Sequence, residues 1–579
     1  MTRFARLLSA SLLVLAAALV PASAATTSRN GPTATGSFLA GQEALNDLRT
    51  AEAANYFVAA SEADPANVLL ADRAFFSQAA DGQVAAAATT ANRLLEIDPA
   101  NELARLLIAS DQVKALQYAA AVTELEKLGT DTFGGITGSI LRAWALIGDN
   151  RADEGIAVID ELGKDGLEEF LVFHKALMLD LAGHTNEAID AAARAYEADP
   201  QVAWVAEAYV RMLGNAGRFQ EARDILTEYA ATGLTHPLID AVTPAITAGK
   251  EPGLFAENVQ IGAAEMFHGV GMALARDGGM DLAMMFLQLA HHLNPTADII
   301  PISIGQLLDA SEQYAAANKI YEGLAESSPM RRIADVRIAQ NFDSMGEHDN
   351  AIQRLEEITA LHPDDLDAYS ILGDIQRSEE HYIEAANAYT RALALTGGDN
   401  QSDWRFYYVR GIAYERAKIW DKAESDFLKA LELNPDQPQV LNYLGYTWVD
   451  QGEHLTQALE MIEKAVAAAP NDGYIVDSLG WAFYRLGRFE EAVEVLEQAV
   501  QTLPNDPEIN DHLGDAYWRA GRRLEAKFQW TVASSVDDVG NVKERVLPKL
   551  TGGLDAVPVS PDSAPIDDPA AADNAEATP

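Results

Sequence analysis

The sequence DSLGWAFYRLGRFEEA, from Asp477 to Ala492, returns 34 residues later as DHLGDAYWRAGRRLEA, from Asp511 to Ala526. Both stretches carry Leu-Gly at their third and fourth positions, an aromatic pair followed by Arg, a second glycine, and a final Glu-Ala. Such self-similarity at a fixed spacing indicates a repeat architecture, in which each unit buries its apolar side against its neighbours.

Prolines mark the same period along much of the chain. Several adjacent prolines stand 34 or 35 residues apart, where a proline would end the second helix of a unit. A period near 34 is typical of stacked helix–turn–helix units. The prolines of this ladder are Pro65, Pro99, Pro200, Pro295, Pro329, Pro363, Pro435, Pro470 and Pro504.

Small residues recur at two positions of each unit, which predicts that its two helices cross closely there. The first position is Gly480 or Gly514 in the quoted stretches, and the second is Ala492 or Ala526. A glycine between them, such as Gly487, suits the turn because it adopts the left-handed conformation without a Cβ clash.

At these residues the chain resembles the tetratricopeptide repeat family, and we count fourteen candidate units. The resemblance implies an all-α fold, a right-handed superhelix of helix–turn–helix units, and a function in protein–protein binding. It is most specific from 404 to 538, good from about 264 to 397, and degenerate nearer the N-terminus.

The pattern predicts five segments. A secretory signal covers 1–24, with Arg3 and Arg6 before an apolar run too short to span a bilayer, and with Ala24 at the cleavage site. The other segments are a degenerate repeat stack over 34–236, an irregular linker or hinge over 237–263, a second stack over 264–540, and a disordered acidic tail over 541–579.

Composition limits the environment and the partners. The net charge of −45 argues against nucleic-acid binding, which depends on Lys and Arg contacts with phosphates, and favours basic or neutral proteins or peptides. The same charge also fits simple solubility of a long exposed stack. The chain has no cysteine, which excludes disulfides and thiol catalysis. After the signal no segment is apolar enough to be transmembrane, so we expect an exported, periplasmic protein of undetermined oligomeric state.

The first helix of each unit should line the concave groove of the solenoid, and helical spacing selects the side chains that point into it. Aromatic and arginine side chains are the usual anchors of protein interfaces. Packing between neighbouring first helices is the alternative reading, above all for the aspartates. The predicted partner-binding residues are Arg405, Tyr408, Arg416, Asn442, Tyr446, Asp477, Trp481, Tyr484, Arg485, Asp511, Asp515, Trp518 and Arg519.

The sequence contains only weak matches to catalytic, metal-binding or cofactor-binding motifs. Adjacent His291 and His292 diverge on a helix and chelate one metal poorly, and the methionines near Met284 suit core packing better than a copper site. We therefore predict no catalytic residue, no metal site and no cofactor.

Two classes of function remain. The first is a non-catalytic exported scaffold that binds envelope proteins in the groove of its C-terminal repeats. The alternative is a helical-superhelix envelope enzyme, such as a wall-cleaving transglycosylase or a sugar transferase, or an auxiliary subunit of polysaccharide or peptidoglycan machinery. An enzyme of this kind needs a compact catalytic domain, and the repeats leave only about forty residues beyond 538.

Overall fold

The computed structural model describes residues 33–163, 166–537 and 540–554, and every regular element in these ranges is helical. Consecutive helices pack two by two, for example α2 with α3 and α29 with α30. This confirms the predicted all-α solenoid. None of the helices in these ranges is both long and apolar enough to cross a bilayer. The predicted signal, 1–24, lies outside the described residues.

Local sequence explains where the helices begin and turn. The Asp506 carboxylate accepts a hydrogen bond from the Ile509 backbone N–H at 3.0 Å, which caps the helix that starts at Pro507. The turns that follow the two quoted first helices contain Gly487 and Gly521 with φ of +73° and +82°, as the repeat pattern requires.

The described chain divides into two compact units, unit 1 up to Ala351 and unit 2 from Ile352. Helix α20 (His348–Leu361) spans the division. The other helices of unit 1 are α2 (Ala34–Asn46), α3 (Thr50–Ala63), α4 (Val68–Ala80), α5 (Val84–Ile97), α6 (Glu102–Lys114), α7 (Tyr118–Leu125), α8 (Phe133–Gly148), α9 (Ala152–Glu161), α10 (Glu168–Leu181), α11 (Thr185–Ala198), α12 (Ala203–Asn215), α13 (Phe219–Ala231), α14 (Pro237–Thr247), α15 (Val259–Arg276), α16 (Met280–Leu293), α17 (Ile299–Ala310), α18 (Tyr314–Glu322) and α19 (Arg331–Ser344).

Unit 2 continues the alternation of first and second helices. Its elements are α21 (Leu366–Ser378), α22 (Tyr382–Thr396), the short 3₁₀ helix η1 (Gln401–Asp403), α23 (Trp404–Arg416), α24 (Trp420–Leu433), α25 (Pro438–Gln451), α26 (Leu455–Ala468), α27 (Gly473–Arg485), α28 (Phe489–Thr502), α29 (Pro507–Arg519), α30 (Arg523–Val536) and α31 (Asn541–Gly552).

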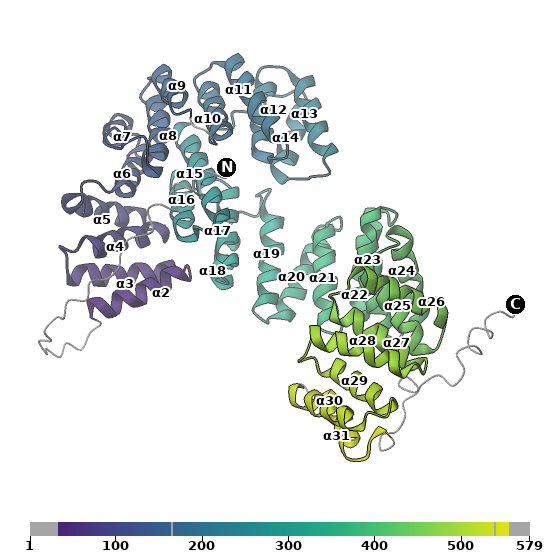
Figure 1. Ribbon diagram of the computed structural model, residues 1–579. Helices are drawn as coiled ribbons and strands as arrows, with labels where there is room; N and C mark the ends of the chain where they lie inside the picture. The colour runs from purple at the N-terminus through teal and green to yellow at the C-terminus, as the bar shows by residue number, and fades with distance from the viewer. Residues whose placement is uncertain (1–32, 164–165, 538–539, 555–579) are drawn as a thin grey trace, which may run out of the picture. The chain divides into compact units, whose positions relative to one another are not determined.

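Helices α15 and α16 of unit 1 lie inside the arc that α2 to α14 describe (Figure 1). They pack on α4, α6, α8 and α10 from the first half of that arc. Polar contacts join the same elements: Lys114 Nζ donates to the Leu293 carbonyl at 3.1 Å, and Gln260 Nε2 donates to the Val113 carbonyl at 2.9 Å. The chain thus fills the hollow of its own N-terminal repeats.

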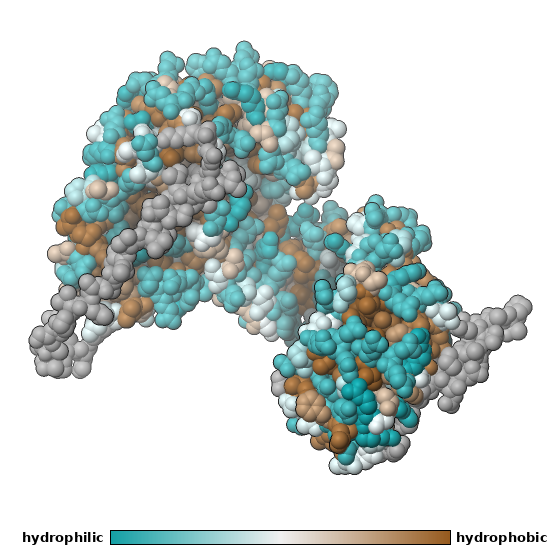
Figure 2. Space-filling model, viewed as in Figure 1, coloured by the Kyte–Doolittle hydropathy of each residue, from teal (hydrophilic) through white to brown (hydrophobic). Residues whose placement is uncertain are grey.

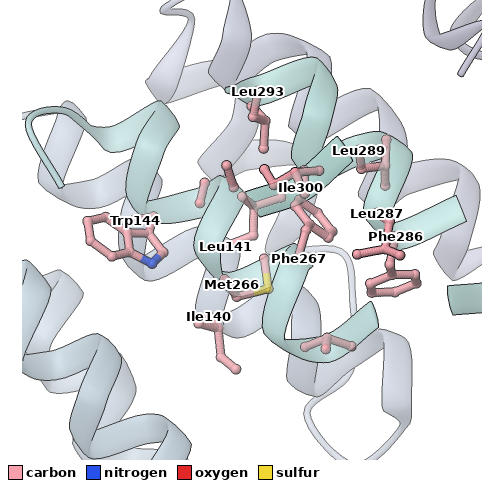
Figure 3. Close-up of a cluster of buried hydrophobic side chains, with 14 of the residues drawn as sticks. Ile140, Leu141, Trp144, Met266, Phe267, Phe286, Leu287, Leu289, Leu293 and Ile300 are labelled. Carbon is pink, nitrogen blue, oxygen red and sulfur yellow. The ribbon is translucent and has the colours of Figure 1, made fainter. Parts of the chain in front are cut away.

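The core of unit 1 forms where this filling occurs. Figure 3 shows Leu141 and Trp144 of α8 beside Met266 and Phe267 of α15, with Phe286 of α16 nearby. All five side chains are fully buried. The methionines of α15 and α16 thus contribute to packing, and burial of this apolar surface stabilises unit 1.

These contacts alter the predicted division of the chain. The predicted stack from 264 to 540 is split, because α15 to α19 belong to unit 1 and the compact units divide at Ala351. The predicted irregular linker 237–263 contains helix α14, which Pro237 can begin because its missing N–H needs no partner in the first turn. Only 248–258 is non-helical there.

The predicted disordered segment 541–579 also begins with a helix, α31, which packs on α29 and α30. Its start at Asn541 lies 34 residues after Pro507, so it occupies the register of a further first helix. The part from 555 onward lies outside the described residues.

Candidate functional site

The predicted groove residues of unit 2 occupy recurring positions on four first helices, α23, α25, α27 and α29. One position lies three residues before the glycine that recurs in these helices (Gly411, Gly445, Gly480 and Gly514), and the other directly follows that glycine. Because the two positions are four residues apart, they lie on the same side of each helix. The first position holds Tyr408, Asn442, Asp477 and Asp511, and the second holds Tyr446, Trp481 and Asp515 in the last three helices.

The structure separates these residues by exposure. Three arginines are exposed, namely Arg405, Arg416 and Arg519. Tyr408, Asn442, Tyr446 and Trp518 are half-buried. Six residues toward the C-terminal end are buried, namely Asp477, Trp481, Tyr484, Arg485, Asp511 and Asp515.

Helix α31 covers the C-terminal end of this surface. Lys549 Nζ lies 2.7 Å from both Asp511 Oδ1 and Asp515 Oδ1, and Arg545 Nε lies 2.7 Å from Asp511 Oδ2. The Trp530 indole N–H also donates to Asp515, at 2.9 Å. Burial, followed by the neighbouring Asp511 carboxylate, raises the pKa of Asp515 to about 6 against the opposing effect of Lys549. The chain's own cations thus satisfy both aspartates.

A second buried ion pair lies one repeat earlier. His512 Nδ1 is 3.0 Å from both carboxylate oxygens of Asp477. Burial alone disfavours the imidazolium, but the carboxylates, Asp477 foremost, outweigh it and raise the pKa of His512 to about 9. The Trp481 ring stacks on the His512 ring with centroids 4.2 Å apart and on Tyr484 at 4.8 Å. Burial raises the pKa of Tyr484 to about 12.

The opposite end, formed by α23 and α25, is more open. Tyr408 and Tyr443 meet edge to face with ring centroids 6.2 Å apart. The Tyr443 hydroxyl donates to Glu415 Oε2 at 3.2 Å, and Arg416 lies exposed beside this pair. Burial raises the pKa of Tyr446 above its usual range, so its hydroxyl stays protonated and can donate. This end offers half-buried rings, a guanidinium and a carboxylate.

Two polar atoms in the middle of the surface have no hydrogen-bond partner among the described residues: Asn442 Oδ1 and Trp481 Nε1. The Asn442 amide N–H donates to Ser478 Oγ at 3.1 Å, which fixes the direction of its carbonyl. Leaving a buried acceptor or donor unpaired costs about 1–3 kcal/mol. Both atoms are covered in the free protein, so a partner reaches them only with a small shift of side chains.

Arg545 and Lys549 were absent from the predicted set. Their positions could have been found from the repeat period, because they stand 34 residues after Asp511 and Asp515. No three His, Asp or Glu side chains are arranged to hold a metal ion within 33–163, 166–537 and 540–554.

Comparison with known proteins identifies tetratricopeptide repeats in part of the chain. Family models of the tetratricopeptide repeat match residues 336–400 and 404–437, and a TPR repeat model matches 480–521. Protein O-mannosyl-transferase TMTC1 of Homo sapiens is 26% identical over 35% of this chain and 22% of its own length. A TPR repeat-containing protein of Pseudomonas aeruginosa is 26% identical over 34% of this chain and 32% of its own.

The chain therefore spans a third or less of these curated relatives. Among solved structures, the APC/C hetero-tetramer Cut9-Hcn1 aligns over 90% of this chain and 96% of the solved chain, with 14% identity and a TM-score of 0.36. The repeats indicate a scaffold for protein–protein interaction. The matched repeat models, which lie between residues 336 and 521, and the paired helices of the described chain together support an all-α tetratricopeptide repeat solenoid.

Proposed function

We propose that this protein is an exported scaffold that binds protein partners of the cell envelope through the first helices of unit 2. The observation that carries the proposal is the open end of that surface, where Tyr408, Tyr443 and Tyr446 are half-buried and Arg405 and Arg416 are exposed. Half-buried rings that packing already holds in place lose little entropy on binding, and arginines beside them add charge-assisted contacts.

The chemistry of this surface favours an extended peptide. Once neighbouring side chains shift, the unpaired Asn442 Oδ1 can accept and the unpaired Trp481 Nε1 can donate, which matches the N–H and C=O groups that an extended backbone presents. The net charge of −45 favours a basic or neutral segment. Figure 2 shows hydrophilic residues interspersed with hydrophobic ones on the visible faces of both units. Asp511 and Asp515 contribute indirectly, because α31 holds them and thereby closes the end of the surface.

A photo-crosslinking amino acid at position 408 or 446, introduced in living cells, tests the surface. We expect covalent adducts with a defined set of proteins at these positions and none at Glu460, an exposed residue of a second helix. Substitution of Tyr443 by Ala should reduce the adducts formed at 408. Equal adducts at 460, or none at 408 and 446, would refute the groove assignment.

The mass of the mature protein tests export separately. Cleavage after Ala24 should leave Ala25 as the first residue of protein recovered from the periplasmic fraction. Retention of the full chain in the cytoplasm would refute the proposed role in the cell envelope but would not affect the proposed binding surface of unit 2.

The similarity to a protein named O-mannosyl-transferase keeps one alternative in view, an auxiliary subunit or enzyme of polysaccharide machinery. Only 22% of that relative is matched. A zymography gel on the purified chain, with peptidoglycan in the matrix, should show no clearing; a cleared band would favour the enzyme.

A further inference from the structure

A polar cleft in unit 1 lies between α12, the segment 248–258, α15 and the start of α17. With the solvent at its mouth it encloses about 1010 Å³. Its lining combines apolar side chains, such as Phe255 and Ile299, with four carboxyl groups, among them Glu207 and Glu265, and a single guanidinium, that of Arg211.

That guanidinium is already engaged. Arg211 Nε donates to Glu207 Oε1 at 2.8 Å, and its Nη1 donates to the Pro252 carbonyl at 2.7 Å. By contrast, no hydrogen bond reaches the Glu265 carboxyl from any residue that the structure describes, although its side chain is only 12% exposed. An ionised carboxylate in such a place needs a cation or a set of donors.

The group nearest to Glu265 cannot supply a donor. His268 is 3% exposed, and its Nε2 lies 2.9 Å from Ser303 Oγ. Because the Ser303 hydroxyl donates to the Ile299 carbonyl at 3.2 Å, its oxygen is left to accept, and we assign the His268 proton to Nε2. The bare Nδ1 is buried without a partner and faces Glu265 Oε2 across 3.9 Å.

Glu265 thus lines the cleft without a donor, and the buried His268 Nδ1 lies 3.9 Å behind its Oε2, also without a donor. A cation that carries several N–H groups satisfies the Glu265 carboxylate and, with a small shift of side chains, His268 Nδ1, whereas an anion or an aliphatic group satisfies neither. We propose that this cleft binds an ammonium or guanidinium group on an apolar stem, which Glu265 and His268 Nδ1 hold from one side and Glu207 attracts from another. Phe255 and Ile299 would cover the stem.

The electrostatics of the cleft agree with this arrangement. Burial, helped by the Glu207 carboxylate, raises the pKa of Glu265 to about 7. Burial lowers the pKa of His268 to about 4, so its imidazole is neutral at physiological pH. A bound cation favours the ionised form of Glu265 and should displace its proton.

Calorimetric titration of the full-length protein with agmatine and cadaverine tests the proposal. Agmatine carries a guanidinium and an ammonium at the two ends of an aliphatic stem, cadaverine carries an ammonium at each end, and 1-pentanol serves as the uncharged control. We expect both cations to bind and pentanol not to bind. At pH 7, heats measured in buffers of different ionisation enthalpy should reveal release of about half a proton per ligand, since the pKa of Glu265 is about 7.

Two matched variants separate the cleft from the general acidity of the surface. Glu265→Gln keeps the shape and should weaken binding about tenfold or more, because the charge that faces the cation is lost. Glu187→Gln removes an exposed carboxylate of α11 and should leave binding unchanged. Equal affinity in both variants, or no binding of either cation by the parent protein, would overturn the proposal.

The ring resonances of His268 provide a readout in the parent chain that does not depend on how a variant folds. Labelled histidine spectra should show one buried ring shifting on addition of agmatine, and no such shift would overturn the assignment. A blocked Ala-Arg-Ala peptide distinguishes the source of the cation. Tighter binding of the peptide than of agmatine would indicate a partner's side chain, and the reverse a free amine. Both cleft and probes are independent of the unit 2 surface.

Discussion

The indole ring of Trp144 in α8 lies directly against the backbone of Gly262 in α15. A Cβ atom built on Gly262 would stand only 2.2 Å from this ring, which is fully buried. The contact joins the N-terminal arc of unit 1 to the helix that fills it, and it requires a residue without a side chain on the α15 side.

Substitution of Gly262 by Ala should therefore destabilise unit 1. The added methyl group must displace the ring or push α15 outward, and overpacking of this kind costs about 1–3 kcal/mol. We expect a lower midpoint for the unfolding transition of unit 1 in chemical denaturation. Gly129→Ala is the control, because a Cβ at Gly129 meets no atom within 4 Å. Equal stability of the two variants would mean that α15 does not pack closely on α8.

Gly480 tests the register of the repeats in the same way. A Cβ at this residue would lie 2.5 Å from Leu496 Cγ, where the two helices of one repeat cross. Gly480→Leu should lower the unfolding free energy of unit 2 by at least about 1–3 kcal/mol. The exposed Ala468 of α26 accepts the same change as a control, Ala468→Leu. An unchanged unfolding curve for Gly480→Leu would show that the assigned register is wrong.

Lys549 joins helix α31 to helix α29 through two buried carboxylates. It is 4% exposed and is the cation shared by Asp511 and Asp515, which are 1% and 5% exposed. Lys549→Met leaves buried carboxylates without this partner, and breaking a buried pair typically costs about 3–5 kcal/mol. Denaturant unfolding at pH 7.5 measures the loss, with Lys543→Met on the exposed side of α31 as the control.

The pH dependence of that loss gives a second check. Because the pKa of Asp515 is raised to about 6, this carboxyl becomes neutral as the pH falls below 6. The penalty of Lys549→Met should thus shrink between pH 7.5 and pH 5. A penalty that stays constant over this range would argue that the two aspartates are not the groups that lose their partner.

The repeat period predicted the helical class and the close crossings at Gly480 and Gly514, because those features depend on contacts within one unit. It could not predict that α15 and α16 enter the hollow of the preceding repeats. That outcome depends on complementarity between distant surfaces, as at Trp144 and Gly262, and each helix taken alone shows only ordinary repeat spacing.

The candidate site shows the same contrast between contacts within one repeat and contacts with a distant segment. Spacing selects residues at recurring positions of the first helices, but it does not tell which of them remain accessible. Arg545 and Lys549 cover Asp511 and Asp515, because they follow these aspartates by one repeat period on helix α31. In this helix Pro548 stands where the preceding first helices have their recurring glycine. Without that glycine, the sequence of α31 does not match the repeat pattern, and the composition of the C-terminal segment predicts disorder.

His512 should make the stability of unit 2 depend on pH above neutrality. Its pKa is raised from the ordinary value of 6.5 to about 9, because the Asp477, Glu508 and Asp511 carboxylates outweigh the effect of burial. A raised folded-state pKa contributes stability that is fully present below pH 6.5 and is lost as the pH rises through 9. The unfolding free energy of unit 2 should thus fall between pH 7 and pH 9.5. His512→Gln should flatten this dependence, and His381→Gln, at an exposed position of unit 2, should retain it. A slope that persists unchanged in His512→Gln would assign the titration to another group and would leave the His512–Asp477 contact without an ionic role.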